Sequence, residues 1–134
     1  MNYHDFEDHV HAIILERGKD YFDRGAVRDL EQTAEGWTVV IEGQTRYTVV
    51  LHGRRQLEDW FCECPHAHGP VCKHVAAALY AVRKWKRQTI EQELNKMSDV
   101  EMRDFICVEA VASPDLFDAI LNHAPSAITD EEEE

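Results

Sequence analysis

A cluster of cysteines and histidines constrains this chain more than any other feature of its sequence. Three of the four cysteines fall within residues 62–74, in the order Cys62-x-Cys64, seven intervening residues, Cys72-x-His74. Thiolate and imidazole are ligands that zinc prefers, and four of them close a tetrahedron. The spacing therefore predicts one structural Zn²⁺ ion, bound by Cys62, Cys64, Cys72 and His74, and no other cofactor.

The elements predicted on either side of the loop give these ligands a reasonable geometry. Cys62 and Cys64 end a predicted strand, where residues i and i+2 point the same way. Cys72 and His74 begin a predicted helix, whose exposed N–H groups help to keep a thiolate ionised. The metal would thus connect a strand to a helix, and the loop between them contains proline and glycine.

Two histidines inside the loop leave the ligand set open. Either His66 or His68 could replace His74, or the two could form a second, weaker site. We expect both to be ordinary loop residues, because His74 has the symmetric Cys-x-His spacing and a helix behind it.

The alternation of patterns along the chain predicts an α+β fold. It has N-terminal helices, a small antiparallel β-meander with the zinc-stapled strand–loop–helix, and an all-helical C-terminal segment. We predict a zinc-binding domain over residues 1–88 and a helical extension with an acidic tail over 89–134. The expected helices cover 4–17, 19–24, about 74 onward, 90–96, 99–111 and 114–123, and the expected strands 27–35, 37–42, 45–51 and 57–62.

Three local signals mark the ends of these elements. Gly43-Gln44 is typical of a type II′ hairpin turn. Ser98 and Glu101 match the capping-box pattern, as do Thr89 and Gln92. Pro125 is expected to end the last helix.

Charge is distributed unevenly. The chain has a net charge of −12, but residues 44–87 hold 8 Lys/Arg against 3 Asp/Glu, a net charge of +5. Residues 88–134 hold 2 Lys/Arg and 13 Asp/Glu, a net charge of −11. The basic third of the chain is therefore the part that contains the cysteine cluster.

Several classes of protein are disfavoured. No apolar run approaches the roughly 20 residues that cross a bilayer, and the first residues do not resemble a signal peptide. We therefore expect a cytoplasmic protein with no membrane partner. A closed four-ligand zinc leaves no position for water or substrate, and the sequence shows no Ser/His/Asp or paired-carboxylate motif. We predict no enzymatic activity, no catalytic residues and no small-molecule substrate.

The order of the ligands resembles that of the SWIM zinc finger, and the resemblance extends over residues 16–82. Upstream, the matching residues include Arg17-Gly18, Tyr21-Phe22, Gly36-Trp37 and Tyr47. Downstream, Cys72-Lys73-His74 followed by an alanine-rich helix is similar to the family's Cys-Lys-His ending. The chain looks like the small stand-alone bacterial members. The resemblance implies metal ligation by the four residues and a role in binding DNA or protein.

The family also occurs in Snf-type helicases, but the helicase motor is absent from this chain. No segment matches the phosphate-binding Gly-x-x-x-x-Gly-Lys-Ser/Thr loop. The chain is therefore not itself the ATPase.

Two hypotheses for function follow. In the first, basic side chains near the zinc site contact the phosphates of DNA or RNA and Tyr80 stacks on a base. We place most of these residues on a stripe opposite the buried face of the zinc helix; the candidates are Arg54, Arg55, Lys73, Tyr80, Arg83, Lys84 and Arg87.

In the second hypothesis the chain is an adaptor for a larger, helicase-like protein partner. The C-terminal helices offer apolar faces that would either bind this partner or pack on the zinc domain; they comprise Met102, Phe105 and Ile106, and Leu116, Phe117, Ile120 and Leu121. A combined reading also stands, in which the acidic C-terminal segment masks the basic face until it is displaced.

Overall fold

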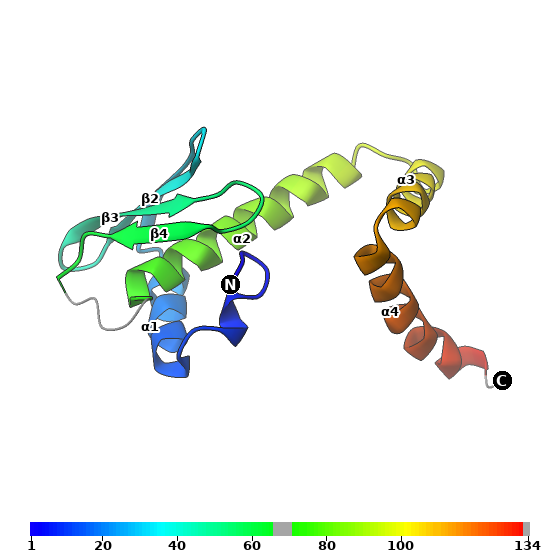
Figure 1. Ribbon diagram of the computed structural model, residues 1–134, viewed down its shortest axis with the longest axis horizontal. Helices are drawn as coiled ribbons and strands as arrows, with labels where there is room; N and C mark the ends of the chain where they lie inside the picture. Colours follow the sequence, from blue (N-terminus) through cyan, green and yellow to red (C-terminus); the bar gives the residue numbers. More distant parts are fainter. Residues whose placement is uncertain (66–70, 133–134) are drawn as a thin grey trace. The chain divides into compact units, whose positions relative to one another are not determined.

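The computed structural model describes residues 1–65 and 71–132, and the side chains of residues 1–65 and 71–123 (Figure 1). Residues Met1–Thr89 form one compact unit and Ile90–Glu134 a second. The first contains a four-stranded antiparallel sheet, a 3-10 turn, the helix α1 (Ala12–Asp23) and most of the helix α2 (Lys73–Leu94), and the second is helical. The predicted α+β class and order of elements are confirmed.

The sheet is a meander in which every strand pairs with its neighbour in sequence. Its strands are β1 (Val27–Gln32), β2 (Gly36–Glu42), β3 (Arg46–His52) and β4 (Asp59–Cys62), in spatial order β1-β2-β3-β4. The central pair β2–β3 is rich in β-branched residues and buries alternate side chains, as a half-buried antiparallel sheet does. Trp37, Val39 and Ile41 of β2 and Val49 and Leu51 of β3 point into the core.

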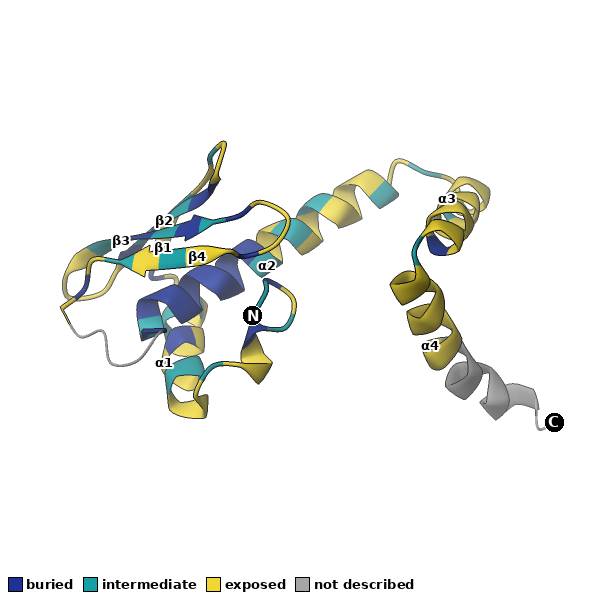
Figure 2. Cartoon of the chain, viewed as in Figure 1, coloured by how far each residue is buried: buried dark blue, intermediate teal, exposed yellow. Residues whose placement is uncertain are grey.

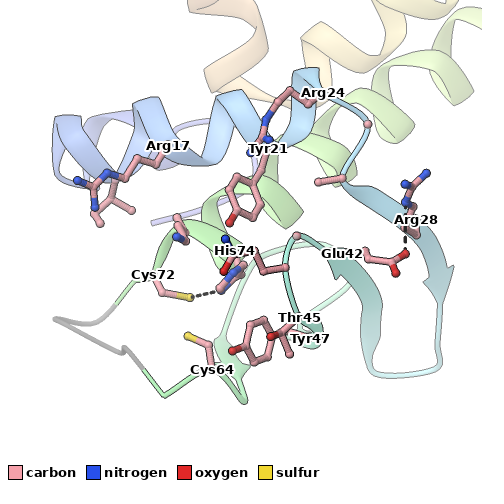
Figure 3. Close-up of a pocket in the computed structure, with 16 residues that line it drawn as sticks. Arg17, Tyr21, Arg24, Arg28, Glu42, Thr45, Tyr47, Cys64, Cys72 and His74 are labelled. Atoms are coloured by element: carbon pink, nitrogen blue, oxygen red, sulfur yellow. Dashed lines mark hydrogen bonds and ion pairs between the residues drawn. The ribbon is translucent and has the colours of Figure 1, made fainter.

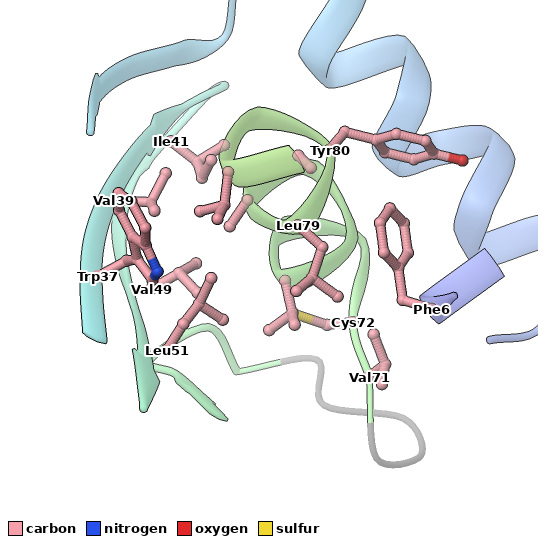
Figure 4. Packing of buried hydrophobic residues seen from close by; sticks show 14 of the residues in the cluster. Phe6, Trp37, Val39, Ile41, Val49, Leu51, Val71, Cys72, Leu79 and Tyr80 are labelled. Atoms are coloured by element: carbon pink, nitrogen blue, oxygen red, sulfur yellow. The ribbon is translucent and has the colours of Figure 1, made fainter. Parts of the chain in front are cut away.

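The helix α2 (Lys73–Leu94) lies between this sheet and the N-terminal segment (Figure 4). On one side Val75, Leu79 and Val82 join the core cluster to which the inward face of the sheet also belongs. On the other side lie η1 (Phe6–Asp8) and α1 (Ala12–Asp23). Because both sides are covered, every residue of α2 from His74 to Val82 is buried.

The N-terminal segment is held to α2 by an aromatic and ionic contact. The Phe6 ring meets the Tyr80 ring edge-on at 4.9 Å. The Tyr80 hydroxyl donates to Glu7 Oε2 at 2.9 Å, and Arg83 Nη1 donates to Glu7 Oε1 at 2.9 Å. The Arg83 hydrogen bond, followed by that from Tyr80, lowers the pKa of Glu7, because both donors favour the charged carboxylate.

This packing corrects one part of the sequence analysis. Tyr80 was placed on an exposed stripe, but only 6% of its surface is exposed. Small side chains surround it on α2, namely Ala76, Ala77 and Ala81. A stripe of alanine and tyrosine is itself apolar enough to be covered, and the N-terminal segment covers it.

The second unit contains the end of α2 and two further helices, α3 (Asp99–Ala112) and α4 (Pro114–Glu132). The capping box at Ser98 and Glu101 is present, with both reciprocal hydrogen bonds. The box predicted at Thr89 is wrong, because α2 runs through that position to Leu94. The end predicted at Pro125 is also wrong, because α4 continues to Glu132; an internal proline weakens a helix without always ending it.

Two other local predictions differ from the structure. Gly18 does not separate two helices but lies inside α1. The β2–β3 connection has three residues between the paired Glu42 and Arg46, and Gly43 does not have the positive φ of a type II′ turn. No helix in the described residues is long and apolar enough to cross a membrane.

Gly18 sets how closely α1 approaches α2. A Cβ at this position would lie 2.5 Å from Ala76 Cβ, 3.0 Å from Ala77 N and 3.0 Å from Lys73 O. Two of these atoms belong to the backbone, so they cannot move away by a change of rotamer as a flexible side chain can. Glycine therefore lets α1 pack directly against the first turns of α2.

We predict that Gly18→Ala destabilises the protein by about 1–3 kcal/mol, the usual cost of overpacking. The loss is expected although alanine favours an isolated helix by about 1 kcal/mol over glycine. Chemical denaturation followed by circular dichroism measures it. Glu16→Ala, an exposed position of the same helix, is the matched control and should change stability by less than about 0.5 kcal/mol. Equal stability of the two variants would contradict the close approach.

Candidate metal centre

Four side chains from two elements converge at one end of the sheet. Cys62 is the last residue of β4 and Cys64 follows it. Cys72 directly precedes α2, and His74 is the second residue of that helix. Their ligand atoms all lie within 4.8 Å of one another. The structure thus brings together the four residues that the sequence analysis selected.

The distances fit a tetrahedral zinc ion. The Cys62 sulfur and the Cys72 sulfur lie 3.8 Å and 3.9 Å from His74 Nδ1. Zinc bonds of about 2.3 Å to sulfur and 2.0 Å to nitrogen, at tetrahedral angles, separate these atoms by about 3.5 Å. A small contraction around a metal therefore completes the site with three thiolates and the Nδ1 atom of one imidazole, and these residues hold one structural zinc ion.

Burial shields the cluster from water. Cys64, Cys72 and His74 are each less than a tenth exposed, and Cys62 is half-buried. All four cysteines lie in the described residues and none forms a disulfide. With four protein ligands, the metal has no coordination position left for water, which is the arrangement of a structural site.

The start of α2 prepares Cys72 as a thiolate. The Cys72 carbonyl accepts from Ala76 N at 3.0 Å, so this residue occupies the N-cap position of the helix. A hydrogen bond from the Cys62 thiol lowers the pKa of Cys72, and hydrogen bonds from His74 and the Val75 N–H act in the same direction against the effect of burial. The same contact with Cys72, followed by burial, raises the pKa of Cys62. Zinc binds cysteine as the thiolate, so metal binding releases protons from these thiols.

Two tyrosine rings fix the imidazole of His74 from outside (Figure 3). The Tyr47 ring lies 4.8 Å from the His74 ring, and the Tyr21 ring lies 5.5 Å from it in an edge-on arrangement. Glu63, which lies between Cys62 and Cys64, accepts from Thr48 N at 3.1 Å. These contacts orient the ligands before metal binds.

A groove of about 1000 Å³ opens beside the cluster, between α1, the β2–β3 loop and the start of α2. Figure 3 shows three arginines of its wall, Arg17, Arg24 and Arg28, and Lys73 also lines it. Arg24 lies 4.9 Å and Lys73 5.2 Å from the centre of the Tyr21 ring. Glu42 is the carboxylate in this wall, and it lies 3.5 Å from Arg28.

The sequence analysis missed most of this groove. Of its candidates for nucleic-acid contact only Lys73 lines the groove. Arg17, Arg24 and Arg28 lie in the N-terminal third of the chain, whose net charge is negative. Adding up the charge of each third therefore did not reveal these arginines. The available signal was local: Arg17, Tyr21 and Arg24 recur at helical spacing, which places them on one face of α1.

The remaining candidates lie elsewhere on the first unit. Arg83 forms an ion pair with Glu7, and its guanidinium carbon lies 4.7 Å from the centre of the Phe6 ring. Lys84 and Arg87 are exposed on α2, and Lys84 lies 5.7 Å from the Phe22 ring. Arg54 and Arg55 are exposed in the β3–β4 connection. His66 and His68, the alternative ligands, lie outside the described residues.

Comparison with known proteins agrees with the geometry. Residues 47–83 match the model of the SWIM zinc finger family. The matched segment runs from β3 to the buried part of α2 and contains all four ligands. No curated protein and no solved structure matches the chain.

We predict that the purified, metal-replete protein contains about one zinc per chain and that Cys72→Ser loses most of it, because three ligands bind zinc far more weakly than four. Metal content is measured by mass spectrometry, and stability by thermal unfolding. Cys107→Ser is the matched control, since Cys107 is an exposed cysteine of α3. Loss of zinc in both variants, or in neither, would count against the assigned ligands.

Proposed function

We propose that the SWIM zinc finger at residues 47–83 is part of a non-enzymatic module that binds nucleic acid through the groove beside its metal. The observation that supports this proposal is the convergence of Arg17, Arg24, Arg28 and Lys73 on the groove. Nucleic-acid affinity depends largely on cationic side chains that neutralise phosphates.

The cations of the groove are held in place before any ligand arrives. Arg24 and Lys73 both lie over the Tyr21 ring, at 4.9 Å and 5.2 Å from its centre. A cation above an aromatic face is attracted by the ring quadrupole. Side chains that are already ordered lose less conformational entropy on binding, which favours affinity.

Carboxylates near the groove reduce its charge but do not cancel it. Arg24 pairs with Asp20 at 2.9 Å, and Arg28 pairs with Glu42 at 3.5 Å. All four side chains are about half exposed, and such surface pairs contribute little free energy. A phosphate can therefore replace either carboxylate as the partner of the arginine.

The concave shape favours a single strand over a duplex. A single-stranded backbone can enter a groove of about 1000 Å³, whereas a duplex meets a surface mainly along its grooves. The metal stabilises one wall, because Cys64, Cys72 and His74 themselves line the groove. Loss of zinc should then abolish binding as well as folding of this region.

The alternative function, an adaptor for a protein partner, is supported by a different part of the chain. The apolar side chains of α3 and α4 are exposed, and the acidic composition of this segment makes it a poor surface for nucleic acid. The two functions use different surfaces, so both can belong to one molecule.

We predict salt-sensitive binding of a labelled single-stranded oligonucleotide, tighter than that of the matching duplex, measured by fluorescence anisotropy at several salt concentrations. Arg17→Gln combined with Arg28→Gln should weaken binding and reduce the salt slope by about one to two, because two phosphate contacts are lost. The control pair Lys84→Gln with Arg87→Gln lies on the exposed face of α2 and should have the smaller effect.

The acidic C-terminal run needs its own control, because it repels a polyanion. A variant in which the five acidic residues 130–134 carry amides should bind the same oligonucleotide more tightly at low salt. No binding by this variant even at low salt would contradict nucleic-acid binding. A loss of binding confined to the control pair on α2 would contradict the groove as its site.

A further inference from the structure

The helices α3 and α4 expose more apolar surface than a two-helix unit can bury by itself. In the described part of the second unit, residues 90–123, only Ala110 is buried. Figure 2 shows both helices mostly in the colour of exposed residues. Ten large apolar side chains of this unit are more than a third exposed: Ile90, Val100, Phe105, Ile106, Val108, Val111, Leu116, Phe117, Ile120 and Leu121.

The distribution of these side chains differs between the two helices. On α4 they are spaced three or four residues apart, so Leu116, Phe117, Ile120 and Leu121 form one face, with Asp115 and Asp118 on the other. On α3 apolar and charged residues are mixed around the helix, and Val111 is 83% exposed. Phe105, Ile106 and Val108 are also more than a third exposed, so contact with α4 alone does not bury the apolar side chains of α3.

The charge of the unit limits what can cover it. Residues 90–123 hold 8 Asp/Glu and 2 Lys/Arg, and residues 90–134 have a net charge of −11. On α3 acidic side chains flank the apolar ones at helical spacing: Glu101 and Glu109 lie four residues before and after Phe105. A second copy would bring an equal negative charge to the same surface, and nucleic acid is excluded for the same reason.

We propose that α3 and α4 form a docking surface for a basic amphipathic helix of a partner protein. The apolar side of that helix would cover Phe105, Phe117 and Ile120, and its lysines or arginines would meet the acidic residues around them. Helix-in-groove recognition of this kind takes its affinity from a few apolar anchors and its selectivity from charge complementarity. This surface stands independently of the proposed nucleic-acid binding, since it lies in the other unit.

The test uses the full chain and a synthetic 18-residue amphipathic helix of leucine and lysine as the probe. Two peptides serve as controls: the same helix with glutamate in place of lysine, and a scrambled peptide of the first composition. We expect calorimetry to show binding of the leucine–lysine helix alone, with an affinity that falls as salt is raised. Equal binding of the glutamate helix, or no binding of the lysine helix, would overturn the proposal.

Two variants separate apolar docking from simple charge attraction. Phe117→Asp with Ile120→Asp removes apolar anchors while adding negative charge, and we expect at least a tenfold loss of affinity for the leucine–lysine helix. Ile13→Asp is the matched control, because Ile13 is 50% exposed in α1 and should not affect binding. Unchanged or tighter binding by the double variant would overturn the proposal.

A second double variant leaves the apolar side chains unchanged. It tests the docking surface even if the aspartate substitutions of the first variant disturb the fold. Asp104→Asn with Glu109→Gln, which flank Val108 and Phe105 on α3, should also weaken binding and reduce its dependence on salt, with an unchanged circular dichroism spectrum. Light scattering of the protein without peptide should give a monomer. A dimer that Phe117→Asp converts to monomer would show that a second copy occupies this surface, which would also overturn the proposal.

Discussion

The coordination of one metal ion by residues from the end of β4 and the start of α2 is the interaction on which the first unit depends. The ligand atoms of Cys62, Cys64, Cys72 and His74 lie within 4.8 Å of one another. They join a strand at the edge of a small sheet to the helix that is buried from His74 to Val82. Because a structural zinc site is rarely formed in the unfolded chain, the free energy of zinc binding adds to the stability of this unit. The packing of α1 through Gly18 and of the N-terminal segment through Phe6 and Glu7 then encloses α2 from the other side.

The same arrangement limits which surfaces the proposed nucleic-acid binding can use. Because α2 is buried from His74 to Val82, its first turns cannot present a basic face to a ligand. The surface that remains beside the metal is the groove whose cations come mainly from α1 and β1. The zinc ion has a structural role here, because its four ligands come from the protein. It holds His74, and with it Tyr21 and Tyr47, in the positions that shape the groove.

The sequence predicted those features that depend on residues close together in the chain, and it did not predict those that depend on distant residues. The ligands were predictable because Cys-x-Cys and Cys-x-His place donor atoms together through strand and helix geometry alone. The β2–β3 hairpin and the Ser98 cap were predictable for the same reason, although the turn at Gly43 has three residues rather than two. The burial of Tyr80 was not predictable, because it depends on Phe6 and Glu7, more than seventy positions away in the chain. The groove was missed because it joins α1, β1 and α2, and no single segment of the sequence shows its charge.

X-ray absorption spectroscopy at the zinc edge tests the closed structural site most directly, because it counts the ligands of the metal without disturbing them. The account predicts three sulfur atoms at about 2.3 Å and one light atom at about 2.0 Å, together with the outer-shell scattering of one imidazole ring. Two sulfur atoms or fewer, or a light-atom ligand without the imidazole signal, would contradict the assignment of a closed site with His74 as its fourth ligand.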